Sequence, residues 1–305
     1  MIASIWLPAT LAAGAMQAWR TAVQRRAARD LSINAAGLVR YLYGLPFAIA
    51  MLLGYHALAA PGAWPALGGQ FWLFCLVGAI GQIVATNLLL MAFGERNFVV
   101  GTAYSKTEAV QAAIFSAVLL HDRLSLLTWA GVALGVVGVM VLATGGRRMG
   151  LLGFVAALGD PAARYGIASG TVFALAVIAI RRTTFEVATA DHILAALVTL
   201  VATVAVQTVL QGGYVLLREP GEMLRVGKSW RVSGQVGLLS SVGSACWFTG
   251  FASAPVALVR IVGQIEVAFT MGFAHFYLGE RMARSEVAGL LIVALGVVLA
   301  LAGAR

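Results

Sequence analysis

The stretch LVRIVGQIEVAF, residues 258–269, places Arg260, Gln264 and Glu266 inside a long run of apolar residues. Burying such polar groups without partners costs several kcal/mol. Their presence therefore indicates that they have buried partners, bind a ligand or line a polar pathway.

The chain around this stretch is far more apolar than a soluble domain. Of its 305 residues, 61% are hydrophobic and 11% are charged, and the mean hydropathy is +0.91. A soluble domain is about 45–50% apolar and about 25% charged. We therefore expect a lipid bilayer around most of the surface. The formal net charge of +9 does not favour nucleic acid, because the arginines are scattered over many short loops, a pattern typical of membrane proteins.

Apolar segments long enough to cross a bilayer as helices recur along the whole chain. They predict an all-α membrane protein with ten transmembrane helices. The expected spans are 3–23, 34–55, 71–92, 98–120, 126–144, 165–181, 190–212, 234–252, 256–278 and 285–303. The longest pieces expected outside the spans are 56–70, 145–164 and 213–233. The amino terminus lacks the basic start of a cleavable signal peptide, so it counts as the first span.

The opening stretch belongs to an internal repeat. Residues 93–139 align without a gap on residues 251–297 at a constant offset of 158 positions, which pairs Glu108 with Glu266. This predicts a five-helix repeat over 1–144, a connecting loop over 145–162 and a second five-helix repeat over 163–305. Because five is odd, the second copy enters the membrane from the opposite side. The sequence thus predicts two inverted repeats around a central cavity.

Three motifs carry a resemblance to a known family. The motif LGER, 278–281, has its glutamate fourteen positions after Glu266, and HDR at 121–123 is a weaker copy of it in the first half. The third motif is RYLYGLPFA, 40–48. Together they resemble the EamA-type carriers of the drug/metabolite transporter superfamily, over nearly the whole chain. The resemblance implies a carrier of small solutes, without a cofactor. This family often has proline after the glutamate, whereas Ala109 and Val267 stand there, so no kink is assigned at those points.

Helical spacing relates the cations of the two repeats. Arg260 and Gln264 are four residues apart and share a helix face, as do their repeat partners Thr102 and Lys106. We interpret Lys106 and Arg260 as lining the cavity, where they would hold the negative group of an anionic or zwitterionic solute. In the competing interpretation each cation pairs with a buried carboxylate and fixes the bundle. A third interpretation applies to Arg260, which is close enough to its span end to reach the interface.

The two glutamates, Glu108 and Glu266, lie two positions beyond Lys106 and Gln264 and are expected to point elsewhere. They are either proton-coupling groups or structural hydrogen-bond partners, and the structural role is favoured. The expected substrate-binding set is Lys106, Arg260, Gln264, Thr102, Gln17, Asn87, Ser244 and Trp247. Close helix contacts are expected from the glycines of spans five and ten, namely Gly131, Gly135, Gly138, Gly289 and Gly296.

The sequence indicates no enzyme. It contains no phosphate-binding GxxxxGK[ST], no HExxH, no Cys/His cluster with metal spacing and no GxSxG. A channel is disfavoured because the charges are few and mixed in sign. We expect a secondary active transporter of a bacterial-type inner membrane, monomeric and working by alternating access. The EamA resemblance implies export, and the favoured solutes are amino acids or related carboxylates. The alternatives are an exchanger of phosphorylated or other organic anions, and a multidrug exporter.

Two arguments predict opposite orientations of the chain in the membrane. The topology usual in the resembled family places the amino terminus in the cytoplasm, which puts four loop cations inside and thirteen outside. The positive-inside rule prefers the reverse. The charge bias therefore predicts that both termini face outward.

Overall fold

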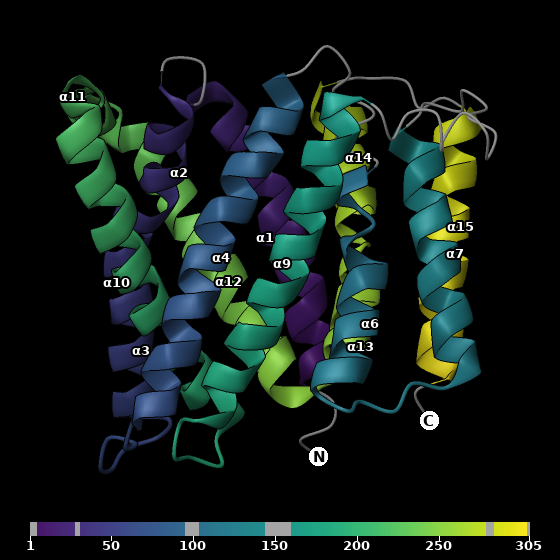
Figure 1. Ribbon diagram of the computed structural model, residues 1–305, viewed down its shortest axis with the longest axis horizontal. Helices are drawn as coiled ribbons and strands as arrows, with labels where there is room; N and C mark the ends of the chain where they lie inside the picture. The colour runs from purple at the N-terminus through teal and green to yellow at the C-terminus, as the bar shows by residue number, and fades with distance from the viewer. Residues whose placement is uncertain (1–4, 28–30, 95–103, 144–159, 279–283, 304–305) are drawn as a thin grey trace. The chain divides into compact units, whose positions relative to one another are not determined.

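The computed structural model describes residues 5–27, 31–94, 104–143, 160–278 and 284–303, and these residues form helices joined by short connections (Figure 1). They contain no strand, and one isolated bridge pairs Leu67 with Val187. The helices are α1 (Trp6–Ala27), α2 (Ile33–Leu42), α3 (Gly44–Leu58), α4 (Gly69–Gly94), α6 (Glu108–Leu119), α7 (Leu126–Ala143), α9 (Pro161–Phe185), α10 (His192–Arg218), α11 (Pro220–Lys228), α12 (Trp230–Ser253), α13 (Val256–Gly263), α14 (Glu266–Leu278) and α15 (Arg284–Ala302).

Among the described residues, five helical segments are long and apolar enough to cross a membrane. One consists of α2 and α3 together, which are separated only by Tyr43, and the others lie in α4, α9, α10 and α12. Shorter apolar helices cover Glu108–Leu119, Leu126–Leu142 and Val287–Ala302. A helix satisfies its own backbone groups, which is what the hydrocarbon core of a bilayer requires. The chain is therefore a multi-pass, all-helical membrane protein.

The region between α10 and α12 differs from the sequence-based expectation. We expected a non-spanning piece over 213–233, but α10 continues to Arg218 and the short helix α11 follows. Pro220 stands in the first turn of α11, where its missing N–H costs nothing. Glu219 accepts a hydrogen bond from Asn34 at 2.7 Å, and Glu222 accepts one from the Ser32 backbone at 2.9 Å. These contacts join α11 to the start of α2.

The described helices group into two compact units. One contains Met1–Ile83 and Ala179–Ala254, and the other contains Val84–Ile178 and Pro255–Arg305. In the first unit α12 packs against α1, and α10 packs against α2, α3 and α12. In the second unit α7 packs against α15, and α6 packs against α13. Each unit thus draws helices from both halves of the sequence.

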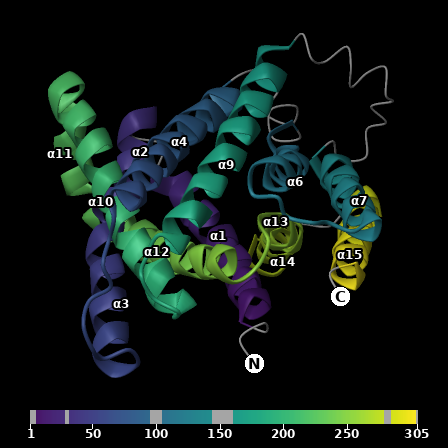
Figure 2. The same cartoon turned by 60° about the horizontal axis from the view of Figure 1, so that its bottom comes forward.

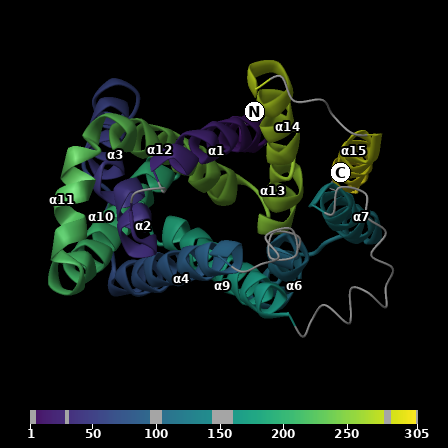
Figure 3. The same cartoon turned by 90° about the horizontal axis from the view of Figure 1, so that it is seen from above.

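The glycines of α7 and α15 bring these two helices into close contact, as expected from the sequence. The helices lie side by side in Figures 2 and 3. A Cβ atom on Gly131 would lie 2.5 Å from the backbone nitrogen of Ala300, and one on Gly296 would lie 2.6 Å from that of Gly135. Such distances leave no room for any side chain. The close helix contacts expected from these glycines are confirmed, and the structure shows that α7 and α15 are the two partners.

Candidate functional site

Two helix breaks stand at equivalent positions of the repeat. α13 ends at Gly263 and α14 begins at Glu266, with Gln264 and Ile265 in a turn between them. In the first half, Lys106 and Thr107 form the corresponding turn and α6 begins at Glu108. The two turns are separated by the offset of the sequence repeat. We expected uninterrupted spans over 98–120 and 256–278, and the structure corrects this.

Local hydrogen bonds explain why the helices break without proline. In the second half, the backbone N–H groups of Gln264 and Ile265 donate three residues back, to Ile261 and Val262. Such bonds tighten the turn and end the regular helix. In the first half, the Thr107 hydroxyl donates to the Tyr104 carbonyl at 2.6 Å. A side chain that bonds nearby backbone groups in this way competes with the helical pattern.

The turn of the first half is further held by α9. Thr171 of α9 donates to the Gln111 side chain at 2.6 Å, and Gln111 donates to the Thr107 hydroxyl at 2.9 Å. Gly170 lets α9 approach closely, because a Cβ there would lie 3.0 Å from the Ser105 carbonyl oxygen. The break is therefore a packed element of the second unit.

Ion pairs cross between the repeats at the two breaks. The guanidinium of Arg260 pairs with the Glu108 carboxylate, and the Lys106 ammonium lies 3.9 Å from the Glu266 carboxylate. The side chains of Arg260 and Glu108 are 16% and 20% exposed. Each cation thus has a carboxylate partner contributed by the other half of the sequence. Breaking such a largely buried pair leaves an uncompensated charge.

The positions of the two glutamates in their helices stabilise their negative charges. Glu108 and Glu266 stand in the first turns of α6 and α14, where the positive end of the helix dipole favours a negative charge. The helices are interrupted just before Glu108 and Glu266. The regular rotation of a helix therefore does not determine where these side chains point relative to Lys106 and Gln264. The expectation that the glutamates simply point away from the cations is replaced by ion pairs across the repeat.

The Gln264 side chain is buried beside these two ion pairs, and its amide group lacks hydrogen bonds within the described residues. It is 8% exposed, and neither its side-chain nitrogen nor its oxygen has a hydrogen-bond partner among the described residues. Gly135 of α7 lies against it, because a Cβ there would lie 2.8 Å from the Gln264 amide oxygen. Buried amides are normally hydrogen-bonded. The amide therefore offers both a donor and an acceptor to a bound molecule.

The other residues of the expected binding set divide between the two units. Gln17 of α1 accepts a hydrogen bond from the Trp247 indole of α12 at 3.0 Å, so this pair joins two helices of the first unit. Ser244 lines a cavity of the same unit. Asn87 lies half-buried on α4, in the second unit. Thr102 lies outside the described residues. That all of these side chains share one cavity stays a prediction.

Sequence reasoning passed over two residues of the first unit, Tyr41 and Gln207. Gln207 is almost fully buried in α10 and donates to the Gln82 side-chain oxygen at 2.8 Å. The sequence did contain a signal for Gln207, because an amide in the middle of an apolar span needs a buried partner or a ligand, as Gln264 does. Tyr41 had no such signal, since a tyrosine near a span end is typical of an interface anchor.

Two repeats, several apolar spanning helices and helices broken beside charged residues together define a membrane transporter. The chain belongs to the EamA-like transporter family, whose sequence model matches residues 4–144 and 161–302. It is thus a membrane transporter of the drug/metabolite transporter superfamily, with a small-molecule solute and a lipid surrounding. This membership implies transport rather than catalysis. Within the described residues, no group of three or more His, Cys, Asp or Glu side chains could hold a metal ion.

The likeness to solved structures is evidence of the fold alone. Twenty-nine chains of solved structures match. One of them, titled only as the crystal structure of a protein, is 17% identical, with a TM-score of 0.70 over 96% of this chain and 98% of that chain. No curated protein matches the sequence at a significant level.

Proposed function

We propose that the protein is a secondary carrier with ten transmembrane helices in two inverted repeats, which moves a small metabolite by alternating access through a bacterial-type inner membrane. The favoured solutes are amino acids, which it would export as a monomer. The observation that carries this proposal is the pair of repeat-related helix breaks, with their crossed ion pairs. Broken helices in transporters expose polar groups at the depth where solute binds.

The balance of charge at the breaks favours a zwitterion. Lys106 and Arg260 contribute two positive charges, and Glu108 and Glu266 contribute two negative charges. A solute with one carboxylate and one ammonium group can exchange with an ion pair without changing the total charge. A phosphorylated anion would bring two further negative charges close to two carboxylates, which costs free energy at low dielectric. Amino acids therefore suit this cluster better than sugar phosphates do.

Substitution of Gln264 tests this proposal without removing either ion pair. Since the amide has no partner within the described residues, Gln264→Met should leave the unfolding temperature in detergent unchanged or higher. Solute affinity should fall by about tenfold, the effect of one lost hydrogen bond to a charged group. We would measure amino-acid binding on monodisperse protein, together with uptake into proteoliposomes.

The matched control is Gln111→Met, because the Gln111 amide is bonded to Thr107 and Thr171. This variant should lose stability. The screen would also include carboxylates, sugar phosphates and quaternary amines, with and without a pH gradient. Amino-acid affinity in Gln264→Met equal to that of the wild type would remove Gln264 from the site. Transport of sugar phosphates or quaternary amines alone would replace the proposed solute class.

The orientation is tested by reporter fusions at the carboxy terminus. The bias of loop cations predicts that this terminus faces outward, because positive loops are retained in the cytoplasm. An alkaline phosphatase fusion should then be active and a green fluorescent protein fusion dark. The same two reporters fused after α7 serve as controls, because an odd number of predicted spans separates that point from the carboxy terminus. A fluorescent carboxy-terminal fusion with inactive phosphatase would reverse the assignment.

A further inference from the structure

The short helix α11 joins the end of α10 to the start of α12 (Figure 1), and one of its faces is packed onto the first unit. Val226 is fully buried, in a hydrophobic cluster with Ala35, Val39 and Val236. The Tyr43 hydroxyl donates a hydrogen bond to the Val226 carbonyl at 2.9 Å. These contacts hold α11 in place and thereby determine which of its faces points outward.

The two acidic residues beside and on α11 have partners of their own. Glu219 accepts hydrogen bonds from the side chains of Ser32 and Asn34, at the start of α2. Glu222 accepts one from the Ser32 backbone at 2.9 Å, and it also pairs with Arg225 at 2.9 Å. Both carboxylates are therefore turned toward the body of the unit, and Arg225 is the cation that they neutralise.

The outward side of this region carries cations together with large apolar side chains. It consists of six residues, named here the basic patch: Arg218, Lys228, Arg231, Leu217, Leu224 and Trp230. The two leucines and the tryptophan are between 59% and 82% exposed. The three cations are exposed as well, and none of them pairs with a carboxylate within the described ranges. On α11, Glu222 and Val226 are four residues apart and share the buried face. Leu224 and Lys228 are also four apart and share the opposite face.

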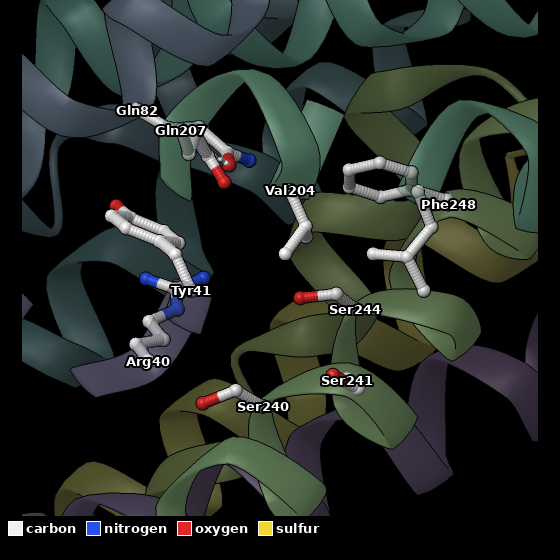
Figure 4. A pocket seen from close by; sticks show the side chains of 10 residues that line it. Arg40, Tyr41, Gln82, Val204, Gln207, Ser240, Ser241, Ser244 and Phe248 are labelled. Atoms are coloured by element: carbon white, nitrogen blue, oxygen red, sulfur yellow. Dashed lines mark hydrogen bonds between the residues drawn. The ribbon is translucent and has the colours of Figure 1, made fainter. Parts of the chain in front are cut away.

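Arg40 of the neighbouring helix α2 shows the contrast with the patch cations. It lines a small pocket among side chains of α4, α10 and α12 (Figure 4), and its guanidinium lies over the Tyr41 ring, 5.7 Å from the centroid. The Arg231 guanidinium also lies over a ring, that of Trp230 at 5.4 Å, but this ring is itself exposed. The charges of the patch therefore face the surroundings of the protein.

We propose that the basic patch binds the phosphate groups of anionic phospholipids at the surface of the bilayer. Because α10 and α12 are spanning helices, the helix that joins their ends lies at this surface. Leucine and tryptophan side chains enter the boundary between headgroups and acyl chains, and the long stems of lysine and arginine let their charges reach the phosphates. Clustered cations of this kind attract anionic lipids. The proposal concerns neither the solute nor the helix breaks, so it can fail independently of the proposed function.

The test is local fluorescence quenching in proteoliposomes of the full-length protein, with Cys75→Ala and Cys246→Ala as background. A bimane label is placed at Gly227→Cys on α11, where a Cβ atom meets no other atom within 4 Å. The quenchers are phosphatidylglycerol and phosphatidylcholine, each with a nitroxide next to its headgroup, in phosphatidylcholine vesicles at constant ionic strength. Phosphatidylglycerol should bind at the label at least about fivefold more tightly, the effect of one cation at the surface. A label at Gly54→Cys on α3, which is equally free of contacts, should show no preference.

Removing charge from the patch should remove the preference. Lys228→Gln combined with Arg231→Gln should lower it at least about fivefold, and the unfolding temperature should stay the same because both side chains are exposed. The matched control is Arg123→Gln combined with Arg164→Gln, which removes two exposed cations outside the patch and should keep the preference. Equal quenching by the two lipids, an unchanged preference in the patch variant or an equal loss in the control would overturn the proposal. Loss of the preference on adding inorganic phosphate at constant ionic strength would assign the patch to free phosphate instead of lipid.

Discussion

Arg260→Gln should lower the free energy of unfolding by about 3 kcal/mol, the lower end of the cost of breaking a buried ion pair. We expect the lower end because both partners keep some exposure, 16% for Arg260 and 20% for Glu108. Glu108→Gln should cost a similar amount, because it leaves the Arg260 guanidinium without its carboxylate. The double variant should lose less than the two single variants together, since neither charge is then left alone. Reversible unfolding in detergent would measure all four proteins.

The Arg182–Glu186 pair provides a control for this cycle. It is also an ion pair, at 3.6 Å, but its side chains are 43% and 26% exposed. Exposed i,i+4 pairs couple by only about 0.3–0.5 kcal/mol. Coupling of the same small size between Arg260 and Glu108 would contradict a structural role for their pair. If Glu108→Gln folds as well as the wild type and loses pH-driven uptake while solute exchange continues, Glu108 is a proton-coupling group.

Gly296→Ala should destabilise the protein by about 3 kcal/mol or more, the upper end of the cost of overpacking. The new Cβ would lie 2.6 Å from the Gly135 nitrogen and 2.8 Å from the Gly131 carbonyl oxygen. Both atoms belong to the backbone of α7, so no side-chain rotation relieves the clash, and the two helices must separate. Thermal unfolding in detergent, followed by circular dichroism, would measure the loss.

The matched control is Gly54→Ala in α3, where a Cβ atom would meet no other atom within 4 Å. Alanine is favoured over glycine in a helix by about 1 kcal/mol, so this variant should be at least as stable as the wild type. If Gly296→Ala unfolds at the same temperature as Gly54→Ala, the close contact of α7 and α15 does not contribute to stability.

Much of the fold follows from the sequence alone, because its determinants are local. Composition and the length of apolar runs predicted a helical membrane protein, and the transporter family is confirmed. The repeat predicted which positions correspond, including Glu108 with Glu266. The glycines of α7 and α15 predicted a close contact because a missing side chain permits backbone approach from whichever helix arrives. The number of spans and the shared cavity remain predictions.

The partners of the polar groups were decided only by the tertiary structure. Arg260 and Glu108 are far apart in the sequence, and helical periodicity relates only neighbours within one continuous helix. The breaks at Lys106 and Gln264 interrupt the helix just before each glutamate, and no proline marks them. The Gln264 amide, which has no partner among the described residues, is likewise a property of packing, because sequence shows which side chains can donate or accept but not which lack a partner. Local residue types thus determined where polar groups enter the membrane, and long-range packing determined which of them are paired and which remain for a ligand.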